Sequence, residues 1–401
     1  MKPKLLAVAS HPIQYYVPLY RSLTQKQQLE LRVVFCREYG VRPTYDRQFG
    51  SYIQWDADLL DGYQHSFLRN FSPITSTFNP LHAFNPGVMP EVWRWADVIW
   101  INGLLYPTNL LAMIAARAKR APVLLRSELH PPQIAGASLK NKLKRLFYRQ
   151  ALRGVDGVMT IGSSNRAAYA SLGVVEEQMT ETPYVVEMNR FRVPVAEREK
   201  RRAQRRSLWG LKDTDIAVLY LGKFTARKHP ESLLTLDRAK HAGRLVLVMV
   251  GSGEMESSVK AEAAKLERAK AIFPGVANQA EIPDIMWASD LFVFPSEREP
   301  WGLVLNEAMA AGIPAIVSDE VGAAADLCVH GETCHVYPFG DNESLIKAVD
   351  QLAGNSNLRG QMSHATLAHI AGWTPENVAR AIERAVWKSL AQSPIAGEFG
   401  G

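Results

Sequence analysis

Residues 291–312 read Leu291-Phe-Val-Phe-Pro-Ser-Glu-Arg-Glu-Pro-Trp-Gly-Leu-Val-Leu-Asn-Glu-Ala-Met-Ala-Ala-Gly312. The apolar start predicts a buried strand, and the segment after Gly302 predicts a helix that ends at Gly312. Glu299 lies in the loop between them, and Glu307 lies on the helix. Main-chain N–H groups at a helix start favour an anion. The stretch therefore predicts a diphosphate at the helix start, with a carboxylate on either side that accepts hydrogen bonds from sugar hydroxyls.

Apolar runs alternate with amphipathic stretches on both sides of this segment. Short hydrophobic strands separated by helices are typical of parallel sheets covered on both faces. The expected strands are Leu5–Ala9, Leu31–Phe35, Val98–Ile101, Val123–Leu125 and Gly157–Ile161, then Ala217–Leu221, Leu245–Val250, Ala271–Phe273, Leu291–Phe294 and Ala315–Val317. The series restarts after a charged stretch near residues 190–208, which predicts two doubly wound domains in tandem. In such folds ligands bind at the carboxyl ends of the strands.

The composition narrows the class of protein. Of the 401 residues, 47% are hydrophobic and 21% charged, which excludes a disordered chain. Three cysteines (Cys36, Cys328 and Cys334) exclude a disulfide scaffold, and without a Cys-x-x-Cys pair a zinc site is not expected. No apolar run reaches the roughly 18 residues needed to span a bilayer. We therefore expect a cytoplasmic protein in a reducing compartment.

The net charge of +6 is concentrated in two stripes. Residues 139–153 contain six basic residues and no acid, and they carry an apolar helical face consisting of Leu139, Leu143, Leu146 and Phe147. This pattern indicates a helix on an anionic membrane surface, so that the protein is peripheral on the cytoplasmic membrane. A core-facing helix with snorkelling cations is the alternative. Residues 196–206 predict a solvated helix at the domain junction. Neither stripe has interleaved aromatic residues, so nucleic acid is not an expected partner.

The stretch 291–312 resembles the signature of the retaining glycosyltransferases of family 4, which have the GT-B fold. Other segments resemble the family in order: 183–191, 220–229, 250–254, 273–276 and 330–341. The resemblance implies an α/β protein with two Rossmann-like, doubly wound domains that face each other across a cleft. The implied domains are residues 1–192 on the acceptor side and 193–374 on the nucleotide-sugar side. Residues 375–401 are expected to be a helix that crosses back to the first domain, followed by a tail.

The resemblance implies an enzyme that moves a hexose-type sugar, with retention, from a nucleoside diphosphate to a glycan or lipid-linked acceptor. UDP is expected from its frequency in the family, and cell-envelope or exopolysaccharide synthesis is the expected setting. Two other functions stay open: a nucleotide-sugar epimerase or phosphorylase on the same fold, and a non-catalytic sugar-nucleotide-binding membrane scaffold. The sequence lacks the cofactor-binding lysine motif of a phosphorylase. Intact Lys228, Glu299 and Glu307 argue against the scaffold.

The resemblance also implies roles for residues of the second domain. Glu299 would contact hydroxyls of the transferred sugar, and Glu307 would bind the nucleotide ribose. Lys223 and Lys228 would neutralise the diphosphate, in place of a metal, as the bond to the sugar breaks. The other implied donor-binding residues are Gly222, Trp301, Gly302 and Leu303. Lys223 stands where the family commonly has arginine, so this contact lacks the bidentate fork.

The first domain departs further from the family. The loop after the first strand lacks the glycines that are frequent there, and His11 and Gln14 are candidates for acceptor or phosphate contact; for each, a helix-start residue without a catalytic role is the alternative. Glu128 stands at a strand end where the family usually has a histidine, and His130 lies two residues on. A carboxylate there can support an oxocarbenium-like centre or accept the acceptor's proton, which makes Glu128 a catalytic candidate. Alternatively, Arg126 pairs with Glu128.

No metal or other cofactor is expected. Asp-x-Asp, through which some glycosyltransferases bind a metal at the end of an apolar strand, occurs at residues 56–58 and 213–215. The first match lies in an irregular aromatic stretch, and the second precedes a strand. The two lysines are therefore the expected source of positive charge at the leaving group.

Overall fold

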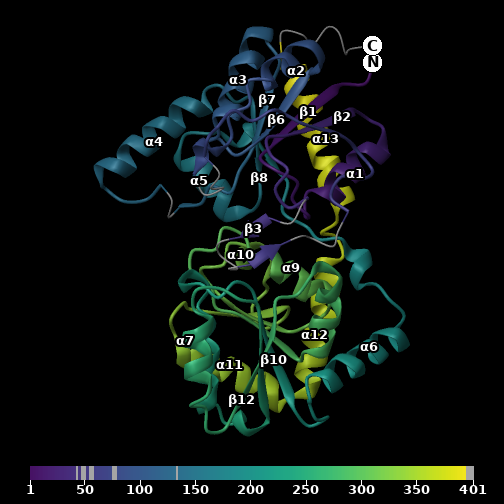
Figure 1. The fold of residues 1–401 in the computed structure, drawn as a ribbon, viewed down its shortest axis with the longest axis vertical. Helices are drawn as coiled ribbons and strands as arrows, with labels where there is room; N and C mark the ends of the chain where they lie inside the picture. The colour runs from purple at the N-terminus through teal and green to yellow at the C-terminus, as the bar shows by residue number, and fades with distance from the viewer. Residues whose placement is uncertain (42–43, 47–50, 54–57, 75–78, 132–133, 394–401) are drawn as a thin grey trace. The chain divides into compact units, whose positions relative to one another are not determined.

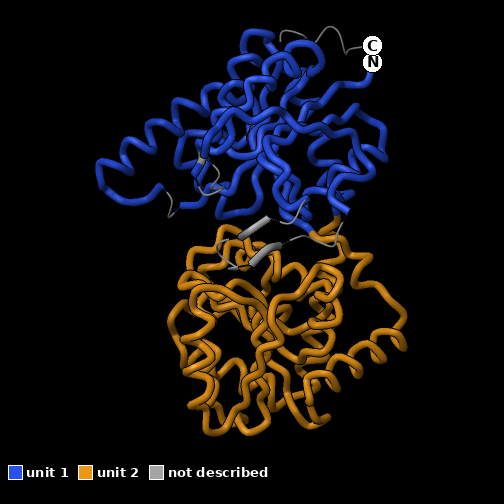
Figure 2. The backbone as a smooth tube through the Cα atoms, viewed as in Figure 1, with its two compact units in different colours: residues 1–43, 58–185, 375–401 blue, residues 44–57, 186–374 orange. Residues whose placement is uncertain are grey.

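The computed structural model describes residues 1–41, 44–46, 51–53, 58–74, 79–131 and 134–393. The chain divides into two units (Figure 2): unit 1 comprises residues 1–43, 58–185 and 375–401, and unit 2 comprises residues 44–57 and 186–374. Each unit contains one sheet of parallel strands with helices packed around it (Figure 1). The predicted α/β class and the two parallel sheets are confirmed. The predicted division of the chain into domains at residues 1–192 and 193–374, followed by a crossing helix, stays a prediction.

The sheet of unit 1 has seven parallel strands in the order β5-β2-β1-β6-β7-β8-β9. Their bounds are Lys4–Ala9 (β1), Glu30–Phe35 (β2), Gln64–Phe67 (β5), Val98–Asn102 (β6), Val123–Arg126 (β7), Gly157–Thr160 (β8) and Met179–Glu181 (β9). The helices are Val17–Lys26 (α1), Val88–Trp95 (α2), Pro107–Lys119 (α3), Leu139–Leu152 (α4), Ser163–Ser171 (α5) and Pro375–Ala391 (α13), with short 3-10 turns at Pro80–His82 (η1) and Glu176–Gln178 (η3). The strand order reverses between β1 and β6.

The sheet of unit 2 has six parallel strands in the order β12-β11-β10-β13-β14-β15, and its order reverses between β10 and β13. The bounds are Ile216–Leu221 (β10), Leu245–Val250 (β11), Lys270–Gly275 (β12), Leu291–Phe294 (β13), Ala315–Ser318 (β14) and Cys334–Tyr337 (β15). The helices are Val195–Leu208 (α6), Glu256–Ala263 (α7), Ile282–Ala288 (α8), Leu303–Ala310 (α9), Ala324–Leu327 (α10), Asn342–Gly354 (α11) and Ser356–Ile370 (α12). Shorter 3-10 turns are Met188–Phe191 (η4), Ala226–Lys228 (η5), Pro230–Arg238 (η6), Ala242–Arg244 (η7) and Gln279–Glu281 (η8). Thr44–Asp46 (β3) and Ser51–Ile53 (β4) form an antiparallel pair.

Burial explains why the strands read as continuous apolar runs. Every residue of β11 and β13 is buried, as are the residues of β1 after Lys4. Strands covered by helices on both faces have no solvent side on which polar residues are needed. Each fully buried leucine or valine in these runs contributes about 1.5–3 kcal/mol to folding. The sheets are therefore rigid platforms for the loops at their carboxyl ends.

The last helix, α13, belongs to unit 1 and packs against α1. Its apolar face is fully buried and consists of Val378, Ile382, Val386 and Leu390. Lys26 of α1 forms an ion pair of 3.9 Å with Glu383 of α13. The chain thus returns to the first sheet after completing the second.

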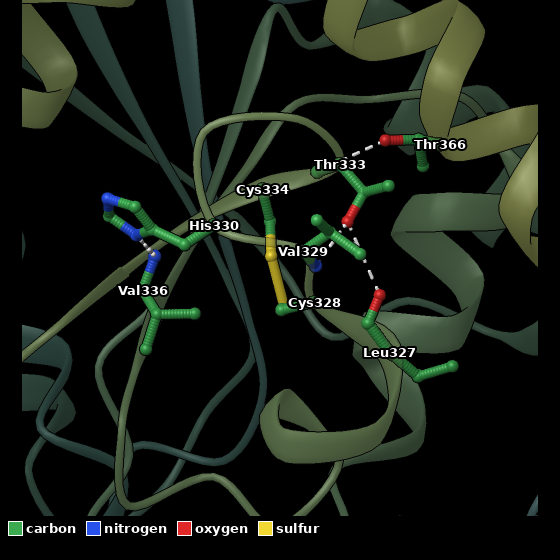
Figure 3. The surroundings of a disulfide bond; sticks show 8 residues. All are labelled: Leu327, Cys328, Val329, His330, Thr333, Cys334, Val336 and Thr366. Carbon is green, nitrogen blue, oxygen red and sulfur yellow. Dashed lines mark hydrogen bonds between the residues drawn. A yellow bond between two sulfur atoms is a disulfide. The ribbon is translucent and has the colours of Figure 1, made fainter.

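Cys328 and Cys334 form a disulfide whose Cα atoms are 5.6 Å apart (Figure 3). The hydroxyl of Thr333 accepts a hydrogen bond from the Val329 amide at 2.8 Å and donates to the Leu327 carbonyl, which closes the turn that brings the two cysteines together. The sequence did not predict this bond, because a separation of six residues does not reveal whether the intervening turn brings the sulfur atoms together. Cys36 is buried with a free thiol, and burial raises its pKa to about 12.

Candidate functional site

In unit 2 the carboxyl ends of β10 and β13 form the point at which the strand order reverses. Open α/β sheets bind ligands at such switch points, because the loops there diverge to opposite faces of the sheet. Residues 222–228 follow β10, and residues 295–302 follow β13. The fold therefore places the predicted diphosphate lysines and Glu299 at one edge of one sheet.

Glu299 and Lys228 form an ion pair at this switch point. The same carboxylate oxygen, Oε2, accepts a hydrogen bond of 2.9 Å from Arg227. Lys228 also lies 5.1 Å from the centre of the Phe294 ring, which is a favourable cation–π distance. Lys228 and Glu299 are mostly buried, whereas Arg227 is half exposed. The structure thus brings together two of the predicted catalytic residues and adds Arg227, which was not predicted from the sequence.

The main chain holds Glu299 in place. Its N–H donates to the Glu320 carbonyl at 3.0 Å, and its carbonyl accepts from the Gly322 N–H at 2.8 Å. A Cβ on Gly322 would lie 2.2 Å from the Pro300 carbonyl oxygen, so only glycine permits this approach. The position of the carboxylate is therefore set by packing between loops of unit 2.

Gly302 precedes α9 with a φ of +95°, and a Cβ there would lie 2.4 Å from the Phe294 ring. This turn presents the first N–H groups of α9 at the switch point, where an anion can satisfy them. The Trp301 indole is buried and donates to the Asn306 side chain at 2.9 Å. The Trp301 carbonyl accepts a hydrogen bond of 3.0 Å from the Ala323 N–H, and the half-buried Leu303 begins the helix. Contact of Trp301 and Leu303 with a donor stays a prediction.

The loop after β10 is closely packed as well. The Gly222 N–H donates to the Val250 carbonyl at 3.0 Å, and a Cβ on Gly251 would lie 1.9 Å from the Gly222 carbonyl oxygen. The Tyr220 hydroxyl donates to the Lys223 carbonyl at 2.7 Å. Lys223 therefore has a fixed main chain and a half-buried side chain on the same loop as Lys228.

Glu307 lies on α9, and 12% of its side chain is exposed. Burial raises the pKa of Glu307 to about 7, and Arg190 acts in the opposite direction. Arg190 Nη1 lies 3.9 Å from Glu307 Oε1. No role for Arg190 was predicted from the sequence, because nothing local links residue 190 to residue 307.

In unit 1 the residues predicted to contact acceptor or phosphate also lie at carboxyl strand ends. His11 and Gln14 follow β1, which lies at the switch point beside β6. The His11 ring accepts or donates a hydrogen bond of 2.9 Å with Ser10 and packs on Tyr39. Burial, aided by nearby His82 and Arg37, lowers the pKa of His11 to about 4, so the ring is neutral at pH 7.

Glu128 is exposed and accepts a hydrogen bond of 2.8 Å from the Tyr184 hydroxyl. Burial raises the pKa of Tyr184, which keeps this hydroxyl protonated as a donor. Nδ1 of His130 lies 3.4 Å from the Glu128 carbonyl. Arg126 is buried, donates to the Thr182 carbonyl at 2.7 Å and stacks on Tyr184. The alternative of an Arg126–Glu128 pair is therefore replaced by a contact through Tyr184.

On α4 the apolar stripe faces solvent. Four side chains expose between 42% and 72% of their surface: Leu139, Leu143, Leu146 and Phe147. Tyr148 and Leu152 are the buried residues of this helix and hold it on unit 1. In Figure 1, α4 extends away from the rest of unit 1. The alternative, an apolar stripe that packs on the core, is wrong, because all four side chains are exposed.

Within the described ranges, no helix is both long and apolar enough to cross a membrane.

The described residues contain no cluster of three or more histidine, cysteine, aspartate or glutamate side chains that could hold a metal ion. Asp215 accepts a hydrogen bond of 2.8 Å from the Lys212 N–H. Asp56 lies outside the described residues. Charge stabilisation by lysine, without a metal, stays a prediction.

The family model described as "Glycosyl transferases group 1" matches residues 201–368, and "Glycosyl transferase 4-like domain" matches residues 33–185. An uncharacterized glycosyltransferase of Methanocaldococcus jannaschii is 31% identical over 158 residues, which are 39% of this chain and 40% of the relative. The lipopolysaccharide core mannosyltransferase LpcC of Rhizobium leguminosarum bv. viciae is 35% identical over 149 residues, or 35% of this chain and 42% of LpcC. The chain spans less than half the length of these curated relatives.

Similar solved structures cover nearly the whole chain. HepE of Anabaena, solved with UDP and glucose, has a TM-score of 0.72 and 15% identity, over 96% of this chain and 99% of HepE. The lipopolysaccharide outer core galactosyltransferase WaaB has a TM-score of 0.67 and 15% identity, over 96% of this chain and 100% of WaaB. At this identity the likeness shows the fold alone, and it confirms the predicted GT-B fold.

Proposed function

We propose that this chain, which belongs to the glycosyltransferases of family 4, transfers a sugar from a nucleoside diphosphate sugar to a hydroxyl group of a glycan or lipid-linked acceptor. One observation carries the proposal: Lys228 and Glu299 are paired at the switch point of unit 2, at the start of α9. A cation suited to a diphosphate and a carboxylate suited to sugar hydroxyls thus lie side by side. The structures of Anabaena HepE with UDP and with UDP-glucose favour UDP as the nucleotide.

The proposed reaction retains the configuration at the anomeric carbon. The bond from this carbon to the diphosphate oxygen breaks, the acceptor oxygen forms the new bond on the same face, and its proton passes to the departing diphosphate. Lys223 and Lys228 stabilise the charge that develops on the diphosphate, without a metal. Glu299 exchanges its ion pairs for hydrogen bonds from sugar hydroxyls. Glu128 supplies negative charge for the oxocarbenium-like sugar.

A donor screen tests this proposal. Thermal shift and donor hydrolysis are measured with UDP-, GDP-, ADP- and TDP-sugars, with and without EDTA. We expect a UDP-sugar to raise Tm, because a ligand that binds only the folded state stabilises it, and we expect slow hydrolysis that EDTA does not change. Stabilisation by a donor without hydrolysis would favour the non-catalytic scaffold, and no stabilisation by any of these donors would contradict the transferase. Hydrolysis that EDTA abolishes would contradict the metal-free account.

We further propose that the protein works at an anionic membrane surface, in cell-envelope or exopolysaccharide synthesis, and docks through α4. The exposed apolar face of α4 is flanked by basic residues at 140, 142, 144, 145, 149 and 153. This combination suits a helix lying in the headgroup region, where apolar burial and attraction to anionic lipid add. The relative LpcC is a lipopolysaccharide core mannosyltransferase, which supports an acceptor of the cell envelope.

Replacing Leu143 and Leu146 together by glutamine is expected to abolish binding to vesicles of phosphatidylcholine and phosphatidylglycerol in a flotation assay. The wild type is expected to bind these vesicles, to release them as salt rises, and not to bind phosphatidylcholine alone. Lys142→Gln is expected to weaken binding, because each basic residue near such a surface contributes about 1 kcal/mol. Lys200→Gln, which removes the same charge from α6, is the matched control. Equal losses in Lys142→Gln and Lys200→Gln would show that net charge, and not α4, directs docking.

A further inference from the structure

Arg190 is fixed by two hydrogen bonds to one residue of unit 2. Nη1 donates to the side-chain oxygen of Gln279 at 3.0 Å, and Nη2 donates to the main-chain carbonyl of Gln279. Arg190 lies in η4, and Gln279 begins η8, a few residues after β12. A guanidinium held at two points is pre-organised, so its charge stays at a defined place. That place is beside Glu307.

The contact between Arg190 and Glu307 differs from the contacts made by Glu299. Arg190 Nη1 and Glu307 Oε1 are 3.9 Å apart, which is an ion-pair distance but too long for a hydrogen bond. In contrast, Oε2 of Glu299 accepts hydrogen bonds from both Arg227 and Lys228. Arg190 therefore supplies positive charge to Glu307 without occupying the lone pairs that a ligand's hydroxyl groups need.

The charge matters because Glu307 is nearly buried. Burial raises the pKa of Glu307 to about 7, and Arg190 is the charged group that opposes this rise. The charged or titratable side chains on the helices packed against α9 are Asp284 of α8 and Arg359, His364 and His369 of α12. Asp284 is paired with Arg201 at 2.6 Å, and Arg359 donates to the Leu352 carbonyl at 2.6 Å. None of these four contributes to the pKa of Glu307.

We propose that Arg190 is a positioning residue for the nucleotide: it favours the ionised form of Glu307 at neutral pH, in which both carboxylate oxygens can accept hydrogen bonds from the ribose hydroxyls. This inference rests on the proposed function, in which Glu307 binds the ribose. An ionised carboxylate accepts hydrogen bonds at both oxygens. A protonated carboxyl carries an O–H group, which is a donor and needs an acceptor of its own. Loss of Arg190 therefore lowers nucleotide affinity at neutral pH and leaves it intact at high pH, where Glu307 ionises unaided.

The test measures the Kd of UDP by calorimetry from pH 6 to pH 9 in the wild type and four variants. Arg190→Gln removes the charge, Arg190→Lys keeps it, Gln279→Ala removes only the side-chain anchor, and Glu307→Gln removes the titrating group. In Arg190→Gln we expect affinity about fivefold weaker at pH 7, a gap that closes by pH 9, and a pH midpoint shifted upward by about one unit. Arg190→Lys and Gln279→Ala should stay within about threefold of the wild type at pH 7. In Glu307→Gln, the part of the pH dependence that Glu307 causes should be lost.

Two outcomes would overturn the inference. An equal loss of affinity at every pH in Arg190→Gln would indicate a structural role, and so would an equal loss when Arg190→Gln is added to Glu307→Gln. If the wild type binds no nucleotide, the proposed function fails, and a second readout still tests the electrostatic link. The rise in Tm caused by Glu307→Gln at pH 8 is compared with and without Arg190→Gln. A larger rise without Arg190 supports the link, and an equal rise contradicts it.

Discussion

Lys228→Ala is expected to lower kcat by about two to three orders of magnitude while the Kd of the nucleotide-sugar donor changes far less. The physical reason is that the charge on the leaving diphosphate grows as the bond to the sugar breaks, so a fixed cation stabilises the transition state more than the bound donor. Before the donor binds, Lys228 is held at this place by its ion pair with Glu299 and by its position over the Phe294 ring. Donor hydrolysis, in which the sugar is transferred to water, gives the value of kcat before an acceptor is known.

Arg227→Ala is the matched control for this prediction. Arg227 is the sequence neighbour of Lys228 and binds the same oxygen of Glu299, but it is half exposed and its interactions are screened by water. We expect a loss in kcat of less than about tenfold. If Lys228→Ala and Arg227→Ala reduce kcat equally, the lysine has no special place at the leaving group. If Lys228→Ala changes the Kd of the donor and kcat/KM but not kcat, then Lys228 binds the donor without acting on the transition state.

Glu307→Gln is expected to weaken UDP binding strongly while making the ligand-free protein more stable above pH 7. The folded protein holds the pKa of Glu307 at about 7, above the usual carboxyl value, because burial disfavours the charge. The free energy of unfolding therefore falls as pH rises from about 4.5 to about 7, since the unfolded chain ionises first. Above pH 7 the ionised carboxylate costs on the order of 1–3 kcal/mol, which glutamine removes.

Tm measured from pH 4 to pH 9 checks the stability part, and UDP calorimetry checks the binding part. Glu307→Gln should match the wild type near pH 4 and exceed it by several degrees at pH 8, on the usual scale of about 2–4 °C per kcal/mol for large domains. Glu262→Gln, which removes an exposed charge paired with Lys265, is the control and should leave Tm unchanged. A Glu307→Gln protein that is less stable at pH 8, or binds UDP normally, would contradict this role for Glu307.

The sequence predicted features that depend on local pattern. Continuous apolar runs indicated strands buried on both faces, and they lie in two parallel sheets. The stretch 291–312 predicted a strand, a loop and a helix opened by Gly302, and these became β13 and α9. The stripe on α4 was ambiguous, because a period of 3.6 residues identifies an apolar face but not what covers it.

Tertiary structure decided which groups meet. Arg190 and Gln279 are 89 residues apart in the chain, and Lys228 and Glu299 are 71 apart, so no local pattern reports either contact. The same holds for Arg126, which the sequence allowed to pair with Glu128 but which packs under Tyr184 instead. The preference of each residue for burial is a property of its own side chain, so the apolar pattern along the chain reports which segments are buried. The sequence by itself therefore determined the sheets and the strand, loop and helix of the site. Ion pairs and pKa values depend on which loops the packed sheets bring to one edge, and this only the tertiary structure decided.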